Sequence, residues 1–312
     1  MKVCLAVVRG EMSTTMNAEA RLRLSLDGLS VGDAFGERFF VDPALIFQQL
    51  GHRSMPPGPW RYSDDTEMAL AIAQTLLECG HVDQDALART FADRYAEEPH
   101  RGYGAGAHRI LEAIAFETPW QQAARLVFDG QGSMGNGAAM RAPVVGAWCA
   151  DLPLEEVAQE ARRSAEVTHA HPDGQAGAIA VAVAAAWAWR SRGDLEAGRR
   201  LIEAAFEHTP PGETRDGIHK ALGTPLSASI TLGMERLGNG RRILSSDTVP
   251  FCLWSAARRL ESFEDAMWQT VSALGDRDTT CAIVGGIVSL FGGPGCIPED
   301  MLTQRETLNW PH

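Results

Sequence analysis

The stretch "RYSDDTEMALAIAQTLLECG", residues 61–80, decides the fold class of this 312-residue chain. Apolar side chains recur in it at helical spacing, at Ala69, Ile72, Ala73 and Leu76. Strand-like alternation bounded by hairpin dipeptides is almost absent elsewhere, so the sequence predicts an all-α fold. Similar amphipathic or alanine-rich runs predict further helices over residues 84–97, 105–116, 153–166, 175–191, 194–207, 248–259, 262–274 and 279–291.

The two ends of this first helix carry typical signals. Asp64 and Glu67 have the spacing of a capping box, and Gly80 is a stop signal. One aspartate at the start satisfies free N–H groups of the first turn and interacts well with the helix dipole. The adjacent Asp65 is not needed for capping, so capping alone does not explain the acidic pair.

Composition limits the classes of function. With 45% hydrophobic residues and no Pro/Ser-rich linker, the chain predicts one compact bundle of many helices. A formal charge of −12 argues against a nucleic-acid binder, which needs a basic surface. The longest membrane-like run, residues 178–189, is shorter than the roughly 20 residues of a spanning helix and predicts a buried helix instead. We therefore expect no nucleic-acid partner and no membrane insertion.

The six cysteines are scattered and show no C-x-x-C spacing. Such cysteines are typical of reduced, mostly buried thiols rather than of a disulfide framework or a zinc site. The beginning of the chain has no apolar run of signal-peptide length. These features favour a cytoplasmic location.

A second acidic junction, "ALGDRDTTCAIVGGIVSLFGG", covers residues 273–293. Asp276 and Asp278 lie two residues apart in a segment that we expect to be extended, where both side chains would point to one side. A helix of small residues follows, and its Gly285-Gly286 pair predicts close packing against another helix.

Together the two junctions offer six hard oxygen ligands, which suit magnesium or manganese. They are Ser63, Asp64, Asp65, Asp276, Asp278 and Thr279. Two divalent ions would neutralise the four carboxylates if the junctions met. The alternative is that the junctions lie far apart and each only caps a helix.

A glycine-rich segment, "FDGQGSMGNGAAMRAPVVG", covers residues 128–146. Such a loop can bring backbone N–H groups against a diphosphate, although glycine-rich loops are commonly only turns. The segment "EVTHAHPDG" adds His169 and His171, and "RGYGAG" at residues 101–106 is a further tight turn. A histidine at a loop-helix boundary is more often structural than a ligand.

In this order the segments resemble the ADP-ribosylglycohydrolase family, whose members include enzymes that remove ADP-ribose from modified arginine or serine. The matching stretches are "GLSVGDAFG" (28–36), "YSDDTEMAL" (62–70), "RGYGAG" (101–106), "GSMGNGAAMRAPVVG" (132–146), "VTHAHPDG" (167–174), "DTVPFCLW" (247–254) and "GDRDTTCAIVGGIVS" (275–289). We accordingly interpret residues 22–312 as one such domain and residues 1–21 as an N-terminal extension.

The resemblance implies a single-domain orthogonal multi-helix bundle with two Mg²⁺ or Mn²⁺ ions. It implies metal binding by the six oxygen ligands named above, with Asp65 or Asp278 accepting a proton in catalysis. It implies ADP-ribose binding by Phe128, Ser133, Gly135, Asn136 and His169. The expected partner is ADP-ribose or an ADP-ribosylated protein or small molecule, from which hydrolysis of the glycosidic bond releases ADP-ribose.

Two departures from the family pattern affect this expectation. Many relatives carry a glutamate on a mobile flap where this chain has Phe40, and the nearest acid is Glu37. The branch that acts on ADP-ribosyl-serine has a tyrosine where this chain has Met134, although "RGYGAG" does match that branch, so both linkages stay open. Two alternatives stay open: a non-catalytic ADP-ribose or nucleotide binder, and a hydrolase of another ribosylated small molecule.

Overall fold

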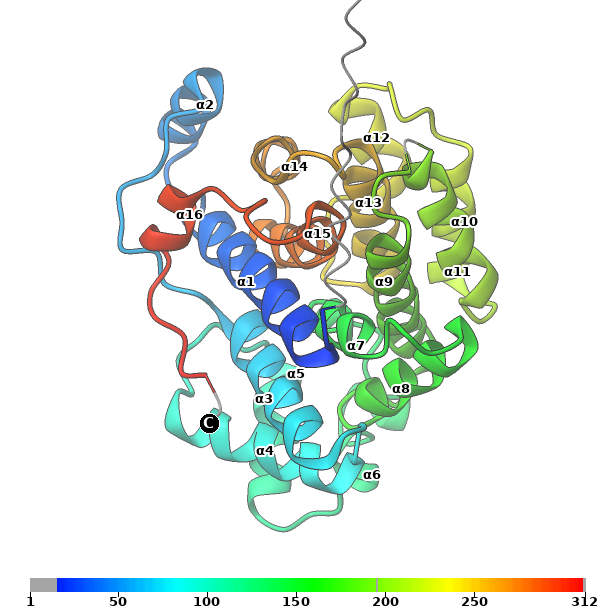
Figure 1. Ribbon diagram of the computed structural model, residues 1–312. Helices are drawn as coiled ribbons and strands as arrows, with labels where there is room; N and C mark the ends of the chain where they lie inside the picture. Colours follow the sequence, from blue (N-terminus) through cyan, green and yellow to red (C-terminus); the bar gives the residue numbers. More distant parts are fainter. Residues whose placement is uncertain (1–15, 195, 311–312) are drawn as a thin grey trace, which may run out of the picture.

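The computed structural model describes residues 16–194 and 196–310. These residues form α-helices joined by loops and two short 3-10 helices, with two isolated β-bridges and no β-strand (Figure 1). The all-α prediction is confirmed. The helices are α1 (Ala18–Glu37), α2 (Pro43–His52), α3 (Asp64–Cys79), α4 (Gln84–Glu97), α5 (Ala105–Ala115), α6 (Trp120–Ala123), η1 (Phe128–Gly130), η2 (Asn136–Ala138), α7 (Pro143–Trp148), α8 (Leu154–Glu166), α9 (Pro172–Arg190), α10 (Ala197–His208), α11 (Glu213–Leu222), α12 (Ile230–Leu237), α13 (Ser245–Arg258), α14 (Phe263–Val271), α15 (Arg277–Gly292) and α16 (Glu299–Gln304).

Helices with a regular apolar stripe were predictable, and α3 and α4 begin and end where the pattern placed them. The pattern missed α1, because its buried face carries small and polar residues such as Gly28, Ser30 and Asp33 in place of an apolar stripe. Helix α1 begins at Ala18, ahead of the expected domain start at residue 22. Residues 1–15 of the expected extension lie outside the described residues.

The expected capping box at the start of α3 is wrong. Ser63 is the N-cap, and its hydroxyl accepts a hydrogen bond from Asp65 N at 3.3 Å. Glu67 turns away from the cap, because the Tyr62 hydroxyl and the Arg94 guanidinium bind its carboxylate at 2.8 and 2.9 Å. The acidic pair is therefore free of the capping role that the spacing suggested.

Helices α1 and α15 pack backbone against backbone through glycines on α1 (Figure 1). A Cβ atom on Gly32 would lie 2.1 Å from the Cys281 carbonyl oxygen, and one on Gly36 would lie 2.3 Å from that of Arg277. Real Cβ atoms do not approach so closely, so larger side chains would push the helices apart. This contact sets the position of the first turn of α15 relative to α1.

The predicted close packing of the Gly285-Gly286 pair is confirmed. A Cβ atom on Gly285 would lie 2.2 Å from the Gly28 carbonyl oxygen on α1, and one on Gly286 would lie 2.6 Å from the Pro143 ring on α7. The pair lets α15 fit between two helices, which offsets the helix propensity that two glycines lose.

The alanine-rich helix α9 lies inside the bundle, with α7, α8, α10, α13 and α15 packed around it (Figure 1). The predicted buried helix over residues 178–189 is thus confirmed. Within the described part of the chain, no helix is both long and apolar enough to cross a membrane. The five cysteines of that part are free thiols, and Cys4 lies outside it.

Candidate functional site

The first acidic junction lies at the N-terminus of α3 and is held by an aspartate of α1. The Asp33 carboxylate accepts hydrogen bonds from Ser63 N at 2.9 Å, Thr66 N at 3.1 Å and Thr66 Oγ1 at 2.6 Å. Asp33 is completely buried. A carboxylate that accepts the free N–H groups of a helix start fixes both the helix and the residues that cap it.

The sequence patterns did not single out Asp33, although it belongs to the stretch "GLSVGDAFG". An ionisable residue among small and apolar residues is the signal that could have found it, since such a residue is rarely buried without a partner. Through Asp33, α1 holds the start of α3, and the same helix packs against α15.

The second acidic junction meets the first. Thr279 Oγ1 lies 3.4 Å from Asp65 Oδ2, and Ser63 Oγ donates to the same oxygen at 2.8 Å. The two junctions, more than 200 residues apart in sequence, thus form a single acidic cluster, which we define as Asp64, Asp65, Asp276 and Asp278.

The expected extended conformation around Asp276 and Asp278 is wrong. Asp276 occupies the N-cap position of α15, and Asp278 lies in the first helical turn, where its Oδ1 accepts from Thr279 N at 2.8 Å. The helix starts earlier than the apolar pattern indicated, because a helix N-terminus stabilises carboxylates through its free N–H groups and dipole.

Burial raises the pKa of every carboxylate in the acidic cluster. Burial, followed by the charge of Asp33, raises the pKa of Asp64 to about 7. Burial and the neighbouring carboxylates raise the pKa values of Asp65 and Asp278 well above their ordinary range, and burial raises that of Asp276. Within the described residues no Lys, Arg or His forms an ion pair with these four carboxylates. Their mutual repulsion is therefore left without a protein counter-charge in contact.

The chemistry of these donors fits a divalent cation. Asp65 Oδ1 is buried and has no hydrogen-bond partner, and carboxylate and hydroxyl oxygens are the ligands that Mg²⁺ and Mn²⁺ prefer. In the conformation described, no group of three or more His, Cys, Asp or Glu side chains in residues 16–194 and 196–310 is arranged to hold a metal ion. The hydroxyls of Ser63 and Thr279 instead donate to Asp65, and a cation would replace these two hydrogen bonds.

The "RGYGAG" turn closes one side of the acidic cluster. Asp64 N donates to the Arg101 carbonyl oxygen at 2.7 Å, and a Cβ atom on Gly102 would lie 3.5 Å from Asp64 Oδ1. The Arg101 side chain contacts the Glu306 carboxylate, which also accepts from Tyr62 N at 2.9 Å. The segment after α16 thus supports the loop that leads into α3.

The glycine-rich segment reaches the acidic cluster through Asn136. Its Nδ2 donates to Asp276 Oδ2 at 2.7 Å and contacts Thr248 Oγ1 at 3.0 Å. The Asn136 backbone N donates to the Ile243 carbonyl oxygen at 3.3 Å, and Ser133 Oγ accepts from Gly135 N at 3.0 Å. This arrangement places a turn of small residues directly beside the carboxylates.

His169 lies under that turn. A Cβ atom on Gly137 would lie 3.5 Å from His169 Nε2, and one on Gly135 would lie 3.7 Å from it. Burial and the nearby Arg141 lower the pKa of His169 to about 3, so the ring is neutral at physiological pH. The second histidine, His171, is the N-cap of α9 and accepts from Asp173 N at 3.1 Å, which is a structural role.

Phe128 stands apart from the other predicted ligand-binding residues. Its side chain is 62% exposed, and its ring edge faces Gly106 of the "RGYGAG" turn at 3.9 Å from where a Cβ atom would stand. The structure thus brings together Ser133, Gly135, Asn136 and His169. Phe128 lies at the surface next to Gly106, the last residue of "RGYGAG".

Phe40, for which the family resemblance led us to expect a glutamate, contacts an arginine. The Arg277 guanidinium lies over the Phe40 ring at 4.7 Å and donates to the Phe39 carbonyl oxygen. Glu37 is exposed at the end of α1, and its charge contributes to raising the pKa of Asp278. Glu37, three residues before Phe40, is therefore an acidic side chain within electrostatic range of the acidic cluster.

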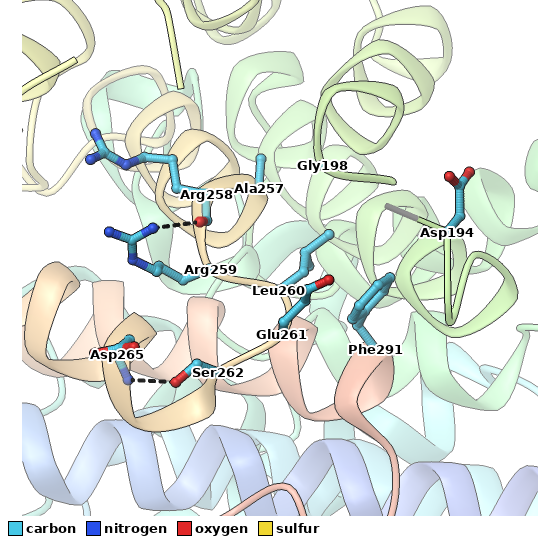
Figure 2. A pocket seen from close by; sticks show the side chains of 10 residues that line it. All are labelled: Asp194, Gly198, Ala257, Arg258, Arg259, Leu260, Glu261, Ser262, Asp265 and Phe291. Carbon is cyan, nitrogen blue, oxygen red and sulfur yellow. Dashed lines mark hydrogen bonds between the residues drawn. The ribbon is translucent and has the colours of Figure 1, made fainter. Parts of the chain in front are cut away.

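A surface cavity of about 450 Å³ lies at the other end of α15 and does not belong to this site (Figure 2). It is lined by Phe291 near the end of α15, by the Arg258-Arg259 pair and by Glu261. A helix of this length separates its two ends by about 20 Å. None of the lining residues belongs to the acidic cluster or to the glycine-rich segment.

Comparison with known proteins shows the family of the chain and agrees with its fold. The family model for ADP-ribosylglycohydrolase matches residues 14–310, so the chain belongs to the ADP-ribosylglycohydrolase family. It is 29% identical to "ADP-ribosylhydrolase ARH3" of Homo sapiens, over 90% of this chain and 87% of that protein. It is 27% identical to "ADP-ribosyl-[dinitrogen reductase] glycohydrolase" of Rhodospirillum rubrum, over 89% and 88%.

A solved structure named "ADP-ribosylglycohydrolase-related protein complex" has the same fold. Its TM-score is 0.66 at 24% identity, over 93% of each chain. This similarity supports the arrangement of helices that brings α3 and α15 together.

Proposed function

We propose that this protein hydrolyses the glycosidic bond between ADP-ribose and a modified acceptor, with two Mg²⁺ or Mn²⁺ ions as cofactors. The observation that carries the proposal is the hydrogen bond from Asn136 to Asp276 at 2.7 Å. It joins a glycine turn suited to a diphosphate with a cluster of carboxylates suited to cations. Cleavage at the ribose of ADP-ribose needs these two functions side by side.

The residues that would hold the cations are Ser63, Asp64, Asp65, Asp276, Asp278 and Thr279. Such ions, when bound, supply neutralising charge and Lewis acidity beside the scissile bond. The partner-free Asp65 Oδ1 and the absence of ion pairs to the cluster in the described part of the chain support this assignment.

The chain's own groups provide binding and proton transfer. Backbone N–H groups of the Gly135 turn, together with Ser133 and Asn136, would bind the diphosphate and orient the ribose. Asp65 or Asp278 would accept the proton of the attacking water, since each is a buried carboxylate within the acidic cluster. Exposed Phe128 would cover the outer end of the ligand.

The acceptor is a protein arginine or serine side chain or a small molecule. The relatives support this class, since one is named an ADP-ribosylhydrolase and the other a glycohydrolase of ADP-ribosyl-dinitrogen reductase. Met134, 37% exposed beside the turn, stands where the serine-specific branch has a tyrosine, so arginine-linked substrates belong in the first test.

The test is turnover of a substrate panel. Peptides that carry ADP-ribosyl-arginine or ADP-ribosyl-serine are incubated with the protein in Mg²⁺, in Mn²⁺ and in EDTA, and released ADP-ribose is measured. We expect release from at least one peptide, with metal only. Binding of ADP-ribose without release from any substrate would identify a binding protein instead, and release that persists in EDTA would remove the metal-dependent mechanism.

A further inference from the structure

Arg141 is a buried cation directly behind the glycine turn. Only 1% of the residue is exposed, and its Nη1 donates to the Gly137 carbonyl oxygen at 3.1 Å. Its guanidinium lies over the Phe91 ring at 4.5 Å. Within residues 16–194 and 196–310 no carboxylate lies within ion-pair distance of it. A buried charge without such a partner is costly, which calls for a functional reason.

A chain of hydrogen bonds leads from Arg141 to the imidazole under the turn. Arg141 Nη2 donates to Thr168 Oγ1 at 2.7 Å, and Thr168 Oγ1 lies 2.8 Å from His169 Nδ1. A guanidinium can only donate, so the Thr168 oxygen is the acceptor in the first bond. No other acceptor for the Thr168 proton is present among the described residues, so this proton goes to His169 Nδ1.

The consequence for His169 is a defined tautomer. Because Nδ1 accepts and the ring is neutral, the ring proton resides on Nε2. Nε2 faces the backbone of Gly135 and Gly137, close to the place where a side chain on either would stand. It finds no acceptor within the described part of the chain. A donor that faces the turn and has no acceptor in the protein can serve a ligand that brings one.

We propose that Arg141 is a positioning residue for the diphosphate: through Thr168 it holds His169 as an Nε2–H donor toward the Gly135–Gly137 turn, and its own charge makes the turn selective for anions. This inference rests on the proposed function and assigns roles to Arg141 and Thr168 in it. Charge selectivity follows because a cation behind the turn, without a carboxylate in contact, attracts the anionic diphosphate much more strongly than an uncharged ligand.

The first experiment measures the tautomer without any ligand. Nitrogen NMR of the imidazoles distinguishes Nε2–H from Nδ1–H, and we expect His169 of the unaltered protein to be Nε2–H. In Thr168→Val we expect a mixture of tautomers, while Thr168→Ser, which keeps the hydroxyl, retains one. Thr209→Val removes another buried hydroxyl, directly after the end of α10, and serves as the control. A His169 ring that is Nδ1–H, or that is unchanged in Thr168→Val, overturns the relay.

The second experiment compares affinities for ADP-ribose and adenosine. Loss of one oriented donor to a charged group predicts about tenfold weaker ADP-ribose binding in Thr168→Val, with Thr168→Ser and Thr209→Val within about twofold of the unaltered protein. Arg141→Met should weaken ADP-ribose binding more than tenfold and adenosine binding less than twofold, and Arg141→Lys should lie between. Equal loss for both ligands would show that Arg141 only stabilises the fold.

The two experiments separate the inference from the function it rests on. If the unaltered protein does not bind ADP-ribose, the proposed function is wrong, whereas the tautomer measurement still decides the relay. If Arg141→Met does not fold, the Thr168 variants decide it, because replacing threonine by valine keeps the shape of the side chain.

Discussion

At the residue scale, Asp278 and Asp300 show how one local geometry serves two purposes. Each lies in the first turn of a helix and accepts a hydrogen bond from the next backbone N–H, at 2.8 and 2.9 Å. Burial and the neighbouring carboxylates raise the pKa of Asp278 well above the ordinary range, whereas Asp300 is exposed at the start of α16. The two residues therefore form a matched pair for a test.

We expect Asp278→Asn to lower hydrolysis by about 10²–10⁴-fold, because an amide neither neutralises a cation nor accepts a proton. Without metal the variant should melt at the same or a higher temperature, since one repulsive charge is removed. Asp300→Asn should leave both properties unchanged. The measurement pairs hydrolysis in Mg²⁺ or Mn²⁺ with melting in EDTA. Wild-type turnover of Asp278→Asn at subsaturating metal would reduce Asp278 to a capping residue.

Replacement of Asp33 should destabilise the protein, unlike replacement of Asp278. The Asp33 carboxylate accepts hydrogen bonds from three donors at the start of α3. Asp33→Asn would turn an NH₂ group toward one of these donors, which predicts a loss of about 1–3 kcal/mol in the free energy of unfolding. Metal affinity should also weaken by about 10–100-fold, as for other residues that support ligands from behind.

The control for Asp33 is Asp27→Asn on the same helix, where the side chain is 42% exposed and pairs with Arg305. This change should alter the free energy of unfolding by less than about 1 kcal/mol. Urea unfolding in EDTA and Mg²⁺ titration measure the two effects. An Asp33→Asn protein as stable as Asp27→Asn would show that Asp33 does not hold the start of α3.

At the element scale, α1 determines where the two junctions meet. One side of it carries Asp33, which holds α3, and another carries the glycines that touch the backbone of α15. The first turn of α15 is thereby placed within hydrogen-bond distance of Asp65. Loss of the α1–α15 contact should therefore damage the site as well as the fold.

Gly32→Ala tests this contact, because the new methyl group would lie 2.1 Å from the Cys281 carbonyl oxygen. We expect a loss of about 1–3 kcal/mol in the free energy of unfolding and weaker metal binding. Gly51→Ala in α2 is the matched control, since nothing lies within 4 Å of its new methyl group. It should stabilise the protein by up to about 1 kcal/mol, as alanine favours helix. Comparable stability of the two variants would contradict the backbone contact.

At the scale of the whole molecule, the acidic cluster links stability to pH and to metal. The pKa of Asp64 is raised to about 7 and that of Asp33 to about 6, both above the 3.8 of an ordinary aspartate. At pH values between the ordinary pKa of 3.8 and the raised pKa values of about 6 and about 7, the folded state therefore binds more protons than the unfolded state. Its stability is greatest at the acidic end of this window and falls as the pH rises through about 7.

In EDTA we expect the free energy of unfolding to fall by more than about 1 kcal/mol between about pH 5 and about pH 8. Saturating Mg²⁺ or Mn²⁺ should remove or reverse this fall, because the cations bind the charged carboxylates. Thermal or urea unfolding at several pH values, with and without metal, measures both effects. If the protein in EDTA is more stable at pH 8 than at pH 5, burial does not destabilise the charged form of these carboxylates.

The sequence by itself determined the helical class, most helix positions and the residue types of the site. Helical periodicity is local, so α3 and α4 could be located to the residue, and Gly285-Gly286 foretold a close helix contact. The ordered motifs indicated the family and therefore the six proposed oxygen ligands as a set. Where polar and small residues interrupted the apolar stripe, as in α1, the local pattern failed.

Only the tertiary structure decided which of these residues touch. Ser63 rather than Asp64 caps α3, and Asp278 lies inside a helix. Asp33 holds the start of α3, and Arg141 contacts the Gly137 carbonyl oxygen. These facts depend on contacts between residues distant in sequence, such as Thr279 with Asp65. No spacing in the sequence encodes them, because the packing of α1 against α15 brings the partners together.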